Sequence, residues 1–262
     1  MQTGARRIAL VRSGRRHAAI TRLITPWDLG ELTQPFVFLD YAELAAGSES
    51  LFFGMHRYPG TASVTVVLNG VLAHGNRTGR RGEIPSGGVE WVKAGSDAWH
   101  QGASASGELL RVFRVSLALP PRSEHSSVES ECIAPQEVEE DGPVKVVLGR
   151  FGRARSRIRS APPDINFFHV HLEDGQRWRY VAPYGHNVTW LAVDHGGLQL
   201  QVSERVYWEQ IVLFEDSSGV IEMQADGDAS FVLGSARRRP GPFMPGEHSL
   251  AAGYAASAPG RS

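Results

Sequence analysis

The chain has 262 residues, and its 27 basic and 28 acidic side chains give a formal net charge of −1 at pH 7. A protein that binds nucleic acid without sequence preference needs a strong positive excess, which this composition excludes. The single cysteine, Cys132, excludes an internal disulfide and any cysteine-rich zinc module. Arginines interrupt the first residues, and no apolar run is long enough to span a bilayer, so we expect a cytoplasmic protein with no membrane partner.

Short β-type runs separated by Gly, Pro and Asn make up the first half of the chain. In the run that ends at Leu119, side chains alternate between two faces, with Phe113 on one and Val112 on the other. Arg111 lies on the Phe113 face, which is an unusual place for a cation if that face is buried. The predicted strands are Ile8–Val11, Ala18–Leu23, Val37–Leu39, Val64–Leu68, Gly70–His74, Val89–Val92 and Leu109–Leu119.

The β pattern is interrupted between residues 120 and 142, where prolines and an acidic stretch indicate a connection between domains. Beyond it the pattern resumes in a similar order, which suggests a duplicated barrel. The Ala-, Gly- and Ser-rich tail after Pro245 has little to bury, and we expect it to be disordered. The predicted strands here are Val144–Leu148, Asn166–Leu172, Val188–Val193, Gly197–Val202, Ile211–Phe214, Val220–Met223 and Ala229–Gly234.

The weak helical periodicity throughout the chain predicts an all-β fold. The length exceeds that of one usual domain, so two domains or one large all-β unit are expected. We predict a first barrel over residues 1–122, a connection over 123–143, a second barrel over 144–245 and the tail over 246–262.

The most informative stretch begins with His56-Arg57-Tyr58-Pro59-Gly60, just before a predicted strand. Side chains two residues apart on a strand share a face, so His56 and Tyr58 place two donors side by side. A His-x-His pair there would coordinate a metal ion. Tyr58 is instead a phenol with an ordinary pKa of about 10, which makes it a poor ligand for divalent metals at neutral pH.

Several segments, taken in order, resemble the pirin family. The resemblance is strong over about residues 35–120 and looser beyond. It implies two cupin (jelly-roll) β-barrels in tandem, a pirin-like bicupin, and barrels of this kind enclose a ligand cavity. The segments are Pro35-Phe36-Val37-Phe38-Leu39-Asp40, His56 with Gly60, Val64-Thr65-x-Val67-Leu68-x-Gly70, His74, Gly79 with Gly82, Gly87-x-Val89-x-Trp91-Val92-x-Ala94-Gly95, His100, Leu119-Pro120, Gly234-Ser235 and Gly241-Pro242-Phe243.

The resemblance also implies a metal site, and this chain departs from it. Typical pirins hold one iron in the N-terminal barrel through a His-Pro-His motif and a later His-x-Glu. By position, His56 and His100 match two of the histidines. Tyr58 replaces the other histidine, and Gly102 stands where the carboxylate is expected. An open ferrous site generally needs three protein donors. We therefore expect no metal cofactor, or iron at low occupancy held by His56 and His100.

Two changes would restore a metal site, although neither fits the family geometry without a backbone rearrangement. Tyr58 could bind ferric iron as a phenolate, or Asp97 or Glu90 could swing inward. Glu90 stands where pirins usually carry glutamine and precedes Trp91. It is either a newly recruited pocket acid or an exposed strand residue.

The favoured hypothesis keeps the pocket of the first barrel without the metal. The catalytic candidates are His56, Tyr58, His100 and Glu90, because a neutral histidine shuttles protons without a metal ion. Such a site suits a small aromatic or polyketide-like molecule, and metal-independent isomerisation or cyclisation. The predicted pocket lining is Trp91, Trp99, Phe113 and Arg111.

Other functions and sites stay open as alternatives. Iron-bearing pirins imply a quercetin 2,3-dioxygenase-like oxygenase, and eukaryotic pirins imply a non-enzymatic regulatory or interaction protein. His169 and His171 form a second His-x-His, which we expect to line the second barrel without a metal. His186 is expected in a turn. Cys132 has no base near it in sequence, so it is not expected to act as a nucleophile. The sequence does not identify the substrate or the oligomeric state.

Overall fold

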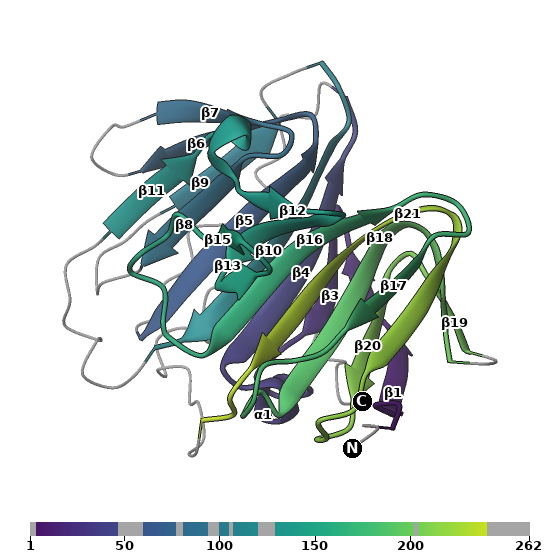
Figure 1. Cartoon of the computed structure of the whole chain (residues 1–262). Helices are drawn as coiled ribbons and strands as arrows, with labels where there is room; N and C mark the ends of the chain where they lie inside the picture. Colours follow the sequence, from purple (N-terminus) through teal and green to yellow (C-terminus); the bar gives the residue numbers. More distant parts are fainter. Residues whose placement is uncertain are drawn as a thin grey trace, which may run out of the picture.

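The computed structural model describes residues 4–46, 60–76, 81–93, 100–104, 107–119, 129–201 and 204–239, apart from the side chains of residues 74–76, 81 and 100–103. The fold in these ranges is almost entirely β, as the sequence predicts (Figure 1). Its helical elements are the one-turn helix α1 (Gly30–Thr33) and the 3-10 helix η2 (Pro135–Glu137). None of the helices in these ranges has the length and apolarity needed to cross a bilayer.

The first barrel consists of a seven-stranded sheet facing a three-stranded sheet. The large sheet has the order β11-β8-β5-β10-β4-β3-β2, and the small one β7-β6-β9. Gly70 joins β5 to β6 with a φ of +77°, and a Cβ there would lie 2.6 Å from the carbonyl oxygen of Leu109, so only glycine fits this passage between sheets. The strands are β2 (Arg15–His17), β3 (Ile20–Ile24), β4 (Phe36–Leu44), β5 (Thr61–Asn69), β6 (Val71–Asn76), β7 (Arg81–Pro85), β8 (Val89–Lys93), β9 (His100–Ser104), β10 (Leu110–Ala118) and β11 (Glu129–Ile133).

The second barrel is formed by one curved sheet of nine strands. Its path is β1-β20-β18-β21-β16-β13-β12, with β17 added beside β21 and β19 beside β18. A separate hairpin pairs β14 with β15. The strands are β1 (Ile8–Ser13), β12 (Glu140–Asp141), β13 (Val144–Leu148), β14 (Arg150–Phe151), β15 (Ala154–Arg155), β16 (Ile165–Leu172), β17 (Arg177–Tyr180), β18 (Val188–Leu200), β19 (Glu204–Tyr207), β20 (Gln210–Phe214) and β21 (Ile221–Ala236).

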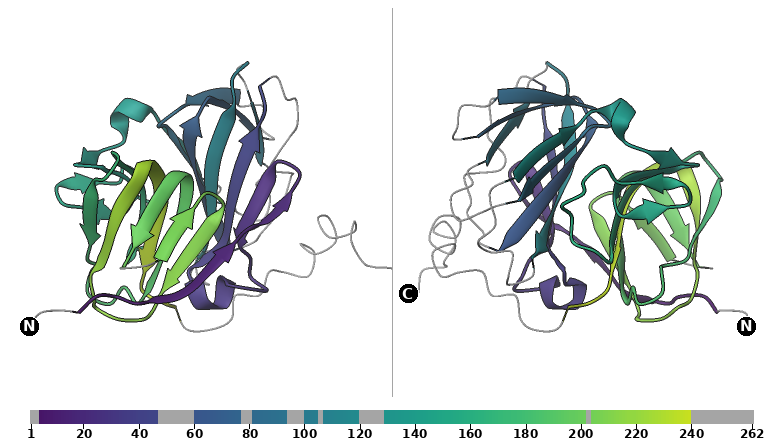
Figure 2. Two further views of the ribbon diagram at one scale, coloured as in Figure 1. Left: turned by 90° about the vertical axis from the view of Figure 1, so that its right-hand side faces the viewer. Right: turned by 60° about the vertical axis from the view of Figure 1, so that its left-hand side comes forward.

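Two segments pair with strands outside the domains to which the sequence analysis assigned them. The N-terminal strand β1 pairs with β20, so the start of the chain lies along the second barrel (Figure 2). The predicted connection over residues 123–143 contains β11, which pairs with β8 of the first barrel, and β12, which pairs with β13 of the second. The division of the chain at these boundaries therefore stays a prediction.

The structure has three apolar cores, one inside each barrel and one between them. One lies between the two sheets of the first barrel and includes Val112 of β10. A second fills the interior of the second barrel. The third, which we call the interbarrel core, joins the outer faces of the two large sheets and includes Phe113 of β10. Phe36 and Trp190 meet edge to face across it, with ring centroids 5.2 Å apart. The predicted alternation along β10 is confirmed, and both of its faces are buried.

The interbarrel core predicts a large cost for truncating Phe113. The Phe113 side chain is fully buried, so Phe113→Ala should lower the free energy of unfolding by about 3–5 kcal/mol in urea denaturation. Leu109, which is 40% exposed just before β10, is the control, and Leu109→Ala should cost well under half as much. Equal losses for the two variants would contradict the assignment of Phe113 to the interbarrel core.

Candidate functional site

The predicted metal and catalytic residues of the first barrel are only partly within the described structure. His56, Tyr58 and Trp99 lie outside the described residues. His100 and Gly102 belong to β9, whose backbone pairs with β6 in the small sheet, but their side chains are not described. The placement of His56, Tyr58 and His100 around one pocket therefore stays a prediction.

The chemistry of the expected donor set does not suit a tightly held metal ion. Glycine at position 102 contributes no side-chain ligand, and a phenol such as that of Tyr58 is ordinarily a poor ligand for a divalent metal ion. His56 and His100 would leave a ferrous ion one donor short of the usual three. The residues present do not fit the iron that the pirin resemblance implies.

Glu90, the remaining catalytic candidate, belongs to a row of paired residues that crosses the large sheet of the first barrel. The row takes one residue from each of β3, β4, β10, β5, β8 and β11. Directly paired residues of antiparallel strands carry their side chains on the same face of the sheet. We call this set the charged row, and its members in order are Arg22, Asp40, Arg114, Thr65, Glu90 and Cys132.

The charged row lies on the interior face of the first barrel. Val67 stands two residues beyond Thr65 in β5 and therefore shares its face. Val67 packs with Leu72 of β6 and Ile84 of β7, which belong to the opposing small sheet. Glu90 is only 2% exposed, so the interpretation of Glu90 as an exposed strand residue is wrong. Sequence reasoning singled out Glu90 and Cys132 separately but did not connect them with Asp40, although Asp40 closes the first pirin-like segment.

Burial determines the ionisation of the charged row. It raises the pKa of Asp40 to about 6, and the positive charges of Arg22 and Arg114 offset this only in part. Arg22 Nε lies 3.4 Å from Asp40 Oδ1. At the other end of the row, Cys132 is exposed on the edge strand β11, but partial desolvation of its thiol and the nearby charge of Glu90 raise the pKa of that thiol to about 11. Cys132 therefore stays protonated at neutral pH, which argues against a nucleophilic role.

Three residues predicted to line the first-barrel pocket lie on the other face of the sheet. Trp91 and Phe113 are fully buried in the interbarrel core. Arg111 donates a hydrogen bond to Asp194 of the second barrel, with Nη1 and Oδ1 3.1 Å apart. Alternation along a strand is the reason, because Trp91 follows Glu90 directly and must point the opposite way. The structure thus corrects the assignment of Trp91, Phe113 and Arg111 to the pocket.

A polar cavity of about 520 Å³ lies between the two barrels, and we call it the interbarrel cleft. The second His-x-His faces this cleft, on the side of β16 opposite the apolar interior of the second barrel. His169 Nε2 lies 2.9 Å from Ser230 Oγ. The lining residues come from both barrels and their connection: Leu68, Ser86, Gly87, Arg111, Glu140, Gly142, Pro143, Lys145, His169, His171, Asp194, His195 and Ser230.

Ser230, His169 and Asp194 do not form a catalytic triad. In a triad the carboxylate holds the histidine, and the histidine in turn takes the proton of the serine. Here Asp194 is hydrogen-bonded to Ser230. Burial also lowers the pKa of His169 to about 4, so this imidazole is a weak base. The cluster is therefore not arranged to activate a nucleophile.

His186 has a structural role at the predicted turn. Its backbone N–H donates to the carbonyl oxygen of Pro183 at 2.9 Å, next to Gly185 with a φ of +87°. The His186 ring is buried, and Nδ1 lies 2.9 Å from Ser235 Oγ. Ser235 Oγ is in turn 2.7 Å from the hydroxyl of Tyr180. Burial lowers the pKa of His186, so the neutral ring tethers the turn to the core.

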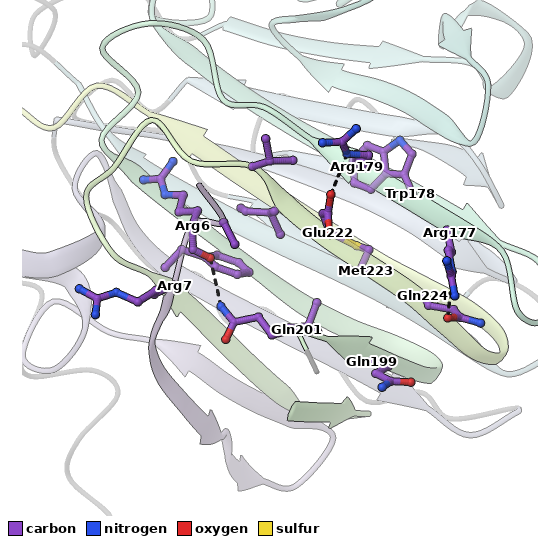
Figure 3. A pocket seen from close by; sticks show the side chains of 15 residues that line it. Arg6, Arg7, Arg177, Trp178, Arg179, Gln199, Gln201, Glu222, Met223 and Gln224 are labelled. Atoms are coloured by element: carbon purple, nitrogen blue, oxygen red, sulfur yellow. Dashed lines mark hydrogen bonds and ion pairs between the residues drawn. The ribbon is translucent and has the colours of Figure 1, made fainter. Parts of the chain in front are cut away.

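A second cavity, of about 680 Å³, lies where the N-terminal segment meets β17, β18 and β21 (Figure 3). Its arginines are already engaged. Arg6 donates to three backbone carbonyl oxygens, including that of Glu215 at 2.7 Å. Arg179 pairs with Glu222 at 3.0 Å. Because these cations are committed to protein groups, the cavity offers little charge to a ligand, and we assign it no function.

Comparison with known proteins agrees with this architecture. The chain is 24% identical over 219 residues to a Pseudomonas aeruginosa protein provisionally named quercetin 2,3-dioxygenase, covering 78% of this chain and 76% of that one. It is 32% identical over 154 residues to a pirin-like protein of Caulobacter vibrioides, covering 55% of each.

Solved structures with the same fold cover most of the chain. A quercetin 2,3-dioxygenase from Acinetobacter baumannii has a TM-score of 0.79 at 20% identity and covers 94% of both chains. The Escherichia coli pirin YhhW, solved in complex with nickel(II), has a TM-score of 0.68 at 16% identity and covers 88% of this chain and 99% of its own. These likenesses show the bicupin fold.

The family model that matches the chain is that of pirin, over residues 17–115. This range runs from the last residue of β2 through most of β10 and contains every member of the charged row except Cys132. The resemblance drawn from the sequence motifs is therefore confirmed, and residues 17–115 of the chain match the pirin family.

Proposed function

We propose that this pirin-like protein binds a small aromatic or polyketide-like molecule in its first barrel and transfers protons on it without a tightly held metal ion. The observation that carries the proposal is the charged row. Its carboxyl and guanidinium groups, those of Asp40, Glu90, Arg22 and Arg114, share the interior face of one sheet. Asp40 and Glu90 are buried, and the two arginines are partly buried. Burying ionisable groups is costly, and such groups cluster at functional sites.

Each part of the charged row suits a step of proton transfer next to a carbonyl group. A carboxylate with a pKa of about 6, such as Asp40, is mostly ionised at neutral pH and can accept a substrate proton. The guanidinium groups of Arg22 and Arg114 lie near Asp40 and would stabilise negative charge on the enolate oxygen that forms. His56 and His100, if they face the same pocket, would return the proton elsewhere on the substrate.

A quercetin 2,3-dioxygenase-like oxygenase is the second candidate function. What favours it is the name carried by relatives, among them the provisionally named Pseudomonas aeruginosa protein. What opposes it is the donor set, in which Tyr58 and Gly102 stand where a histidine and a glutamate are expected. The two candidates differ in their need for metal and dioxygen, so they can be separated by experiment.

The metal content of the purified protein is the first test. Because Tyr58 and Gly102 supply no good ligand, protein purified without chelator should contain well under one iron per chain by elemental analysis. The double variant Tyr58→His, Gly102→Glu should bind more iron, because each new donor adds a bond to the metal. Full iron occupancy in the unmodified protein, with all protein bonds from the first barrel, would refute the incomplete site.

Binding of quercetin under anaerobic conditions separates the two functions. With chelator present, quercetin should still quench the tryptophan fluorescence of the protein, because binding does not need a metal. Glu90→Gln should weaken binding by about tenfold, because it removes one charge-assisted hydrogen bond to the ligand. Glu131 is the matched control, since it pairs with Trp91 and lies on the opposite face of the sheet.

The oxygenase alternative predicts a different outcome of the quercetin experiment. If chelator abolishes binding, and Fe(II) with air restores it while one dioxygen is consumed per quercetin, the protein is an oxygenase and the metal-free proposal is wrong. Unchanged binding in both Glu90→Gln and His100→Ala would remove the first barrel as the site.

The raised pKa of Asp40 predicts a pH-dependent stability difference. Folding raises this pKa from 3.8 to about 6, so the folded state holds the proton more tightly, and stability falls as pH rises from about 4 to 6. Relative to Asp40→Asn, the unmodified protein should lose up to about 3 kcal/mol of unfolding free energy across that window. Urea denaturation of both proteins at several pH values measures the difference. If the unmodified protein instead gained stability relative to Asp40→Asn as pH rises, the arginines, not burial, would set this pKa.

A further inference from the structure

The interbarrel cleft has features of a binding site that are separate from the first-barrel pocket. Ser86 and Gly87 of the first barrel line one side of it, and residues of β13, β16 and β18 of the second barrel line the other side. One ion pair crosses it, between Arg111 and Asp194, and the Asp194 side chain is 2% exposed. A cavity of about 520 Å³ has the size of many small-molecule sites.

The hydrogen-bond chain in the cleft determines which nitrogen of His169 carries the proton. Burial raises the pKa of Asp194, but the guanidinium of Arg111 at 3.1 Å favours its carboxylate form, which only accepts hydrogen bonds. Ser230 must donate its one proton to Asp194 and accept from His169 Nε2. His169 Nδ1 is then left as a bare acceptor. It is buried and has no hydrogen-bond partner among the described residues, as is also true of Arg111 Nε.

Among the described residues, the cleft contains a cation without an ion-pair partner, although Arg111 and Lys145 are matched in number by Asp194 and Glu140. Lys145 lines the cleft and makes no ion pair within the ranges that the structure describes. Its ammonium group lies close to the side formed by the first barrel, 3.6 Å from where a Cβ on Gly87 would be. Lys145, His171 and Arg111 all act on the ionisation of His169, so these groups surround its imidazole. Asp194 and Glu140 oppose a second or third negative charge on any ligand.

We propose that the interbarrel cleft binds a small hydroxylated monocarboxylate, such as a sugar acid. Its carboxylate would pair with Lys145 and lie toward Arg111, and a hydroxyl group would donate to His169 Nδ1. A polyanion fits less well because Asp194 and Glu140 are already present. A metal ion is not proposed, because no suitable group of three ligands exists in the described ranges.

The two lysines of the chain, Lys93 and Lys145, provide a direct footprint. Lys93 pairs with Glu129 in the first barrel and does not line the cleft, so it serves as the internal reference. Millimolar gluconate should slow acetylation of Lys145 by acetic anhydride, measured by peptide mass spectrometry, and leave the rate at Lys93 unchanged. Sorbitol lacks the carboxylate and hexanoate lacks the hydroxyls, so both should protect Lys145 much less.

Calorimetry with variants completes the test. Lys145→Gln should weaken gluconate binding by about tenfold, and Lys93→Gln should leave it unchanged. Glu90→Gln should also leave it unchanged, which keeps this test independent of the first-barrel proposal. Absence of protection at Lys145, equal protection by hexanoate, sorbitol or inorganic phosphate, or an equal loss in Lys93→Gln would each overturn the assignment.

Discussion

The packing of the two large sheets against each other is the constraint on which the rest of the structure depends. Each sheet buries one face inside its own barrel, and its strands at the junction also bury their other face in the interbarrel core. Alternate residues of a strand such as β10 therefore serve different purposes. Val112 belongs to the first barrel, and Phe113 to the junction with the second. A change of register by one residue would exchange these roles along the whole strand.

This two-sided burial explains why the ionisable residues of the sheets are paired or clustered. Arg111 lies on the buried outer face and is compatible with it because Asp194 meets it from the other barrel. Removing either partner would leave a buried charge without compensation, which costs more than the pair contributes. Packing alone does not explain why charged residues occupy the inner face, because apolar residues of similar size would be stabilising there. A functional reason accounts better for its presence.

The sequence predicted the strands and their alternation well, because both follow from local period and turn chemistry. It did not predict which face of β10 turns toward the pocket. Phe113 and Trp91 are the kind of residue that lines an aromatic-binding cavity, and only the second barrel shows that they are covered by another sheet. The pairing of β1 with β20 was missed for the same reason, since the two strands are about two hundred residues apart. The adjacent runs within β18 looked separate because a bulge near Gly196, with a φ of +70°, interrupts their period.

The two barrels share an architecture but differ in where they place polar groups. In the second barrel the interior is an apolar core, and the polar residues of β16 and β18, such as His169 and Asp194, lie on its outer face. In the first barrel the charged row lies inside, and the outer face is apolar. A duplicated fold therefore provides two chemically distinct environments from equivalent sheets. An organic ligand that needs acid–base groups suits the first interior, and a charged ligand suits the cleft that the outer face of the second barrel helps to form.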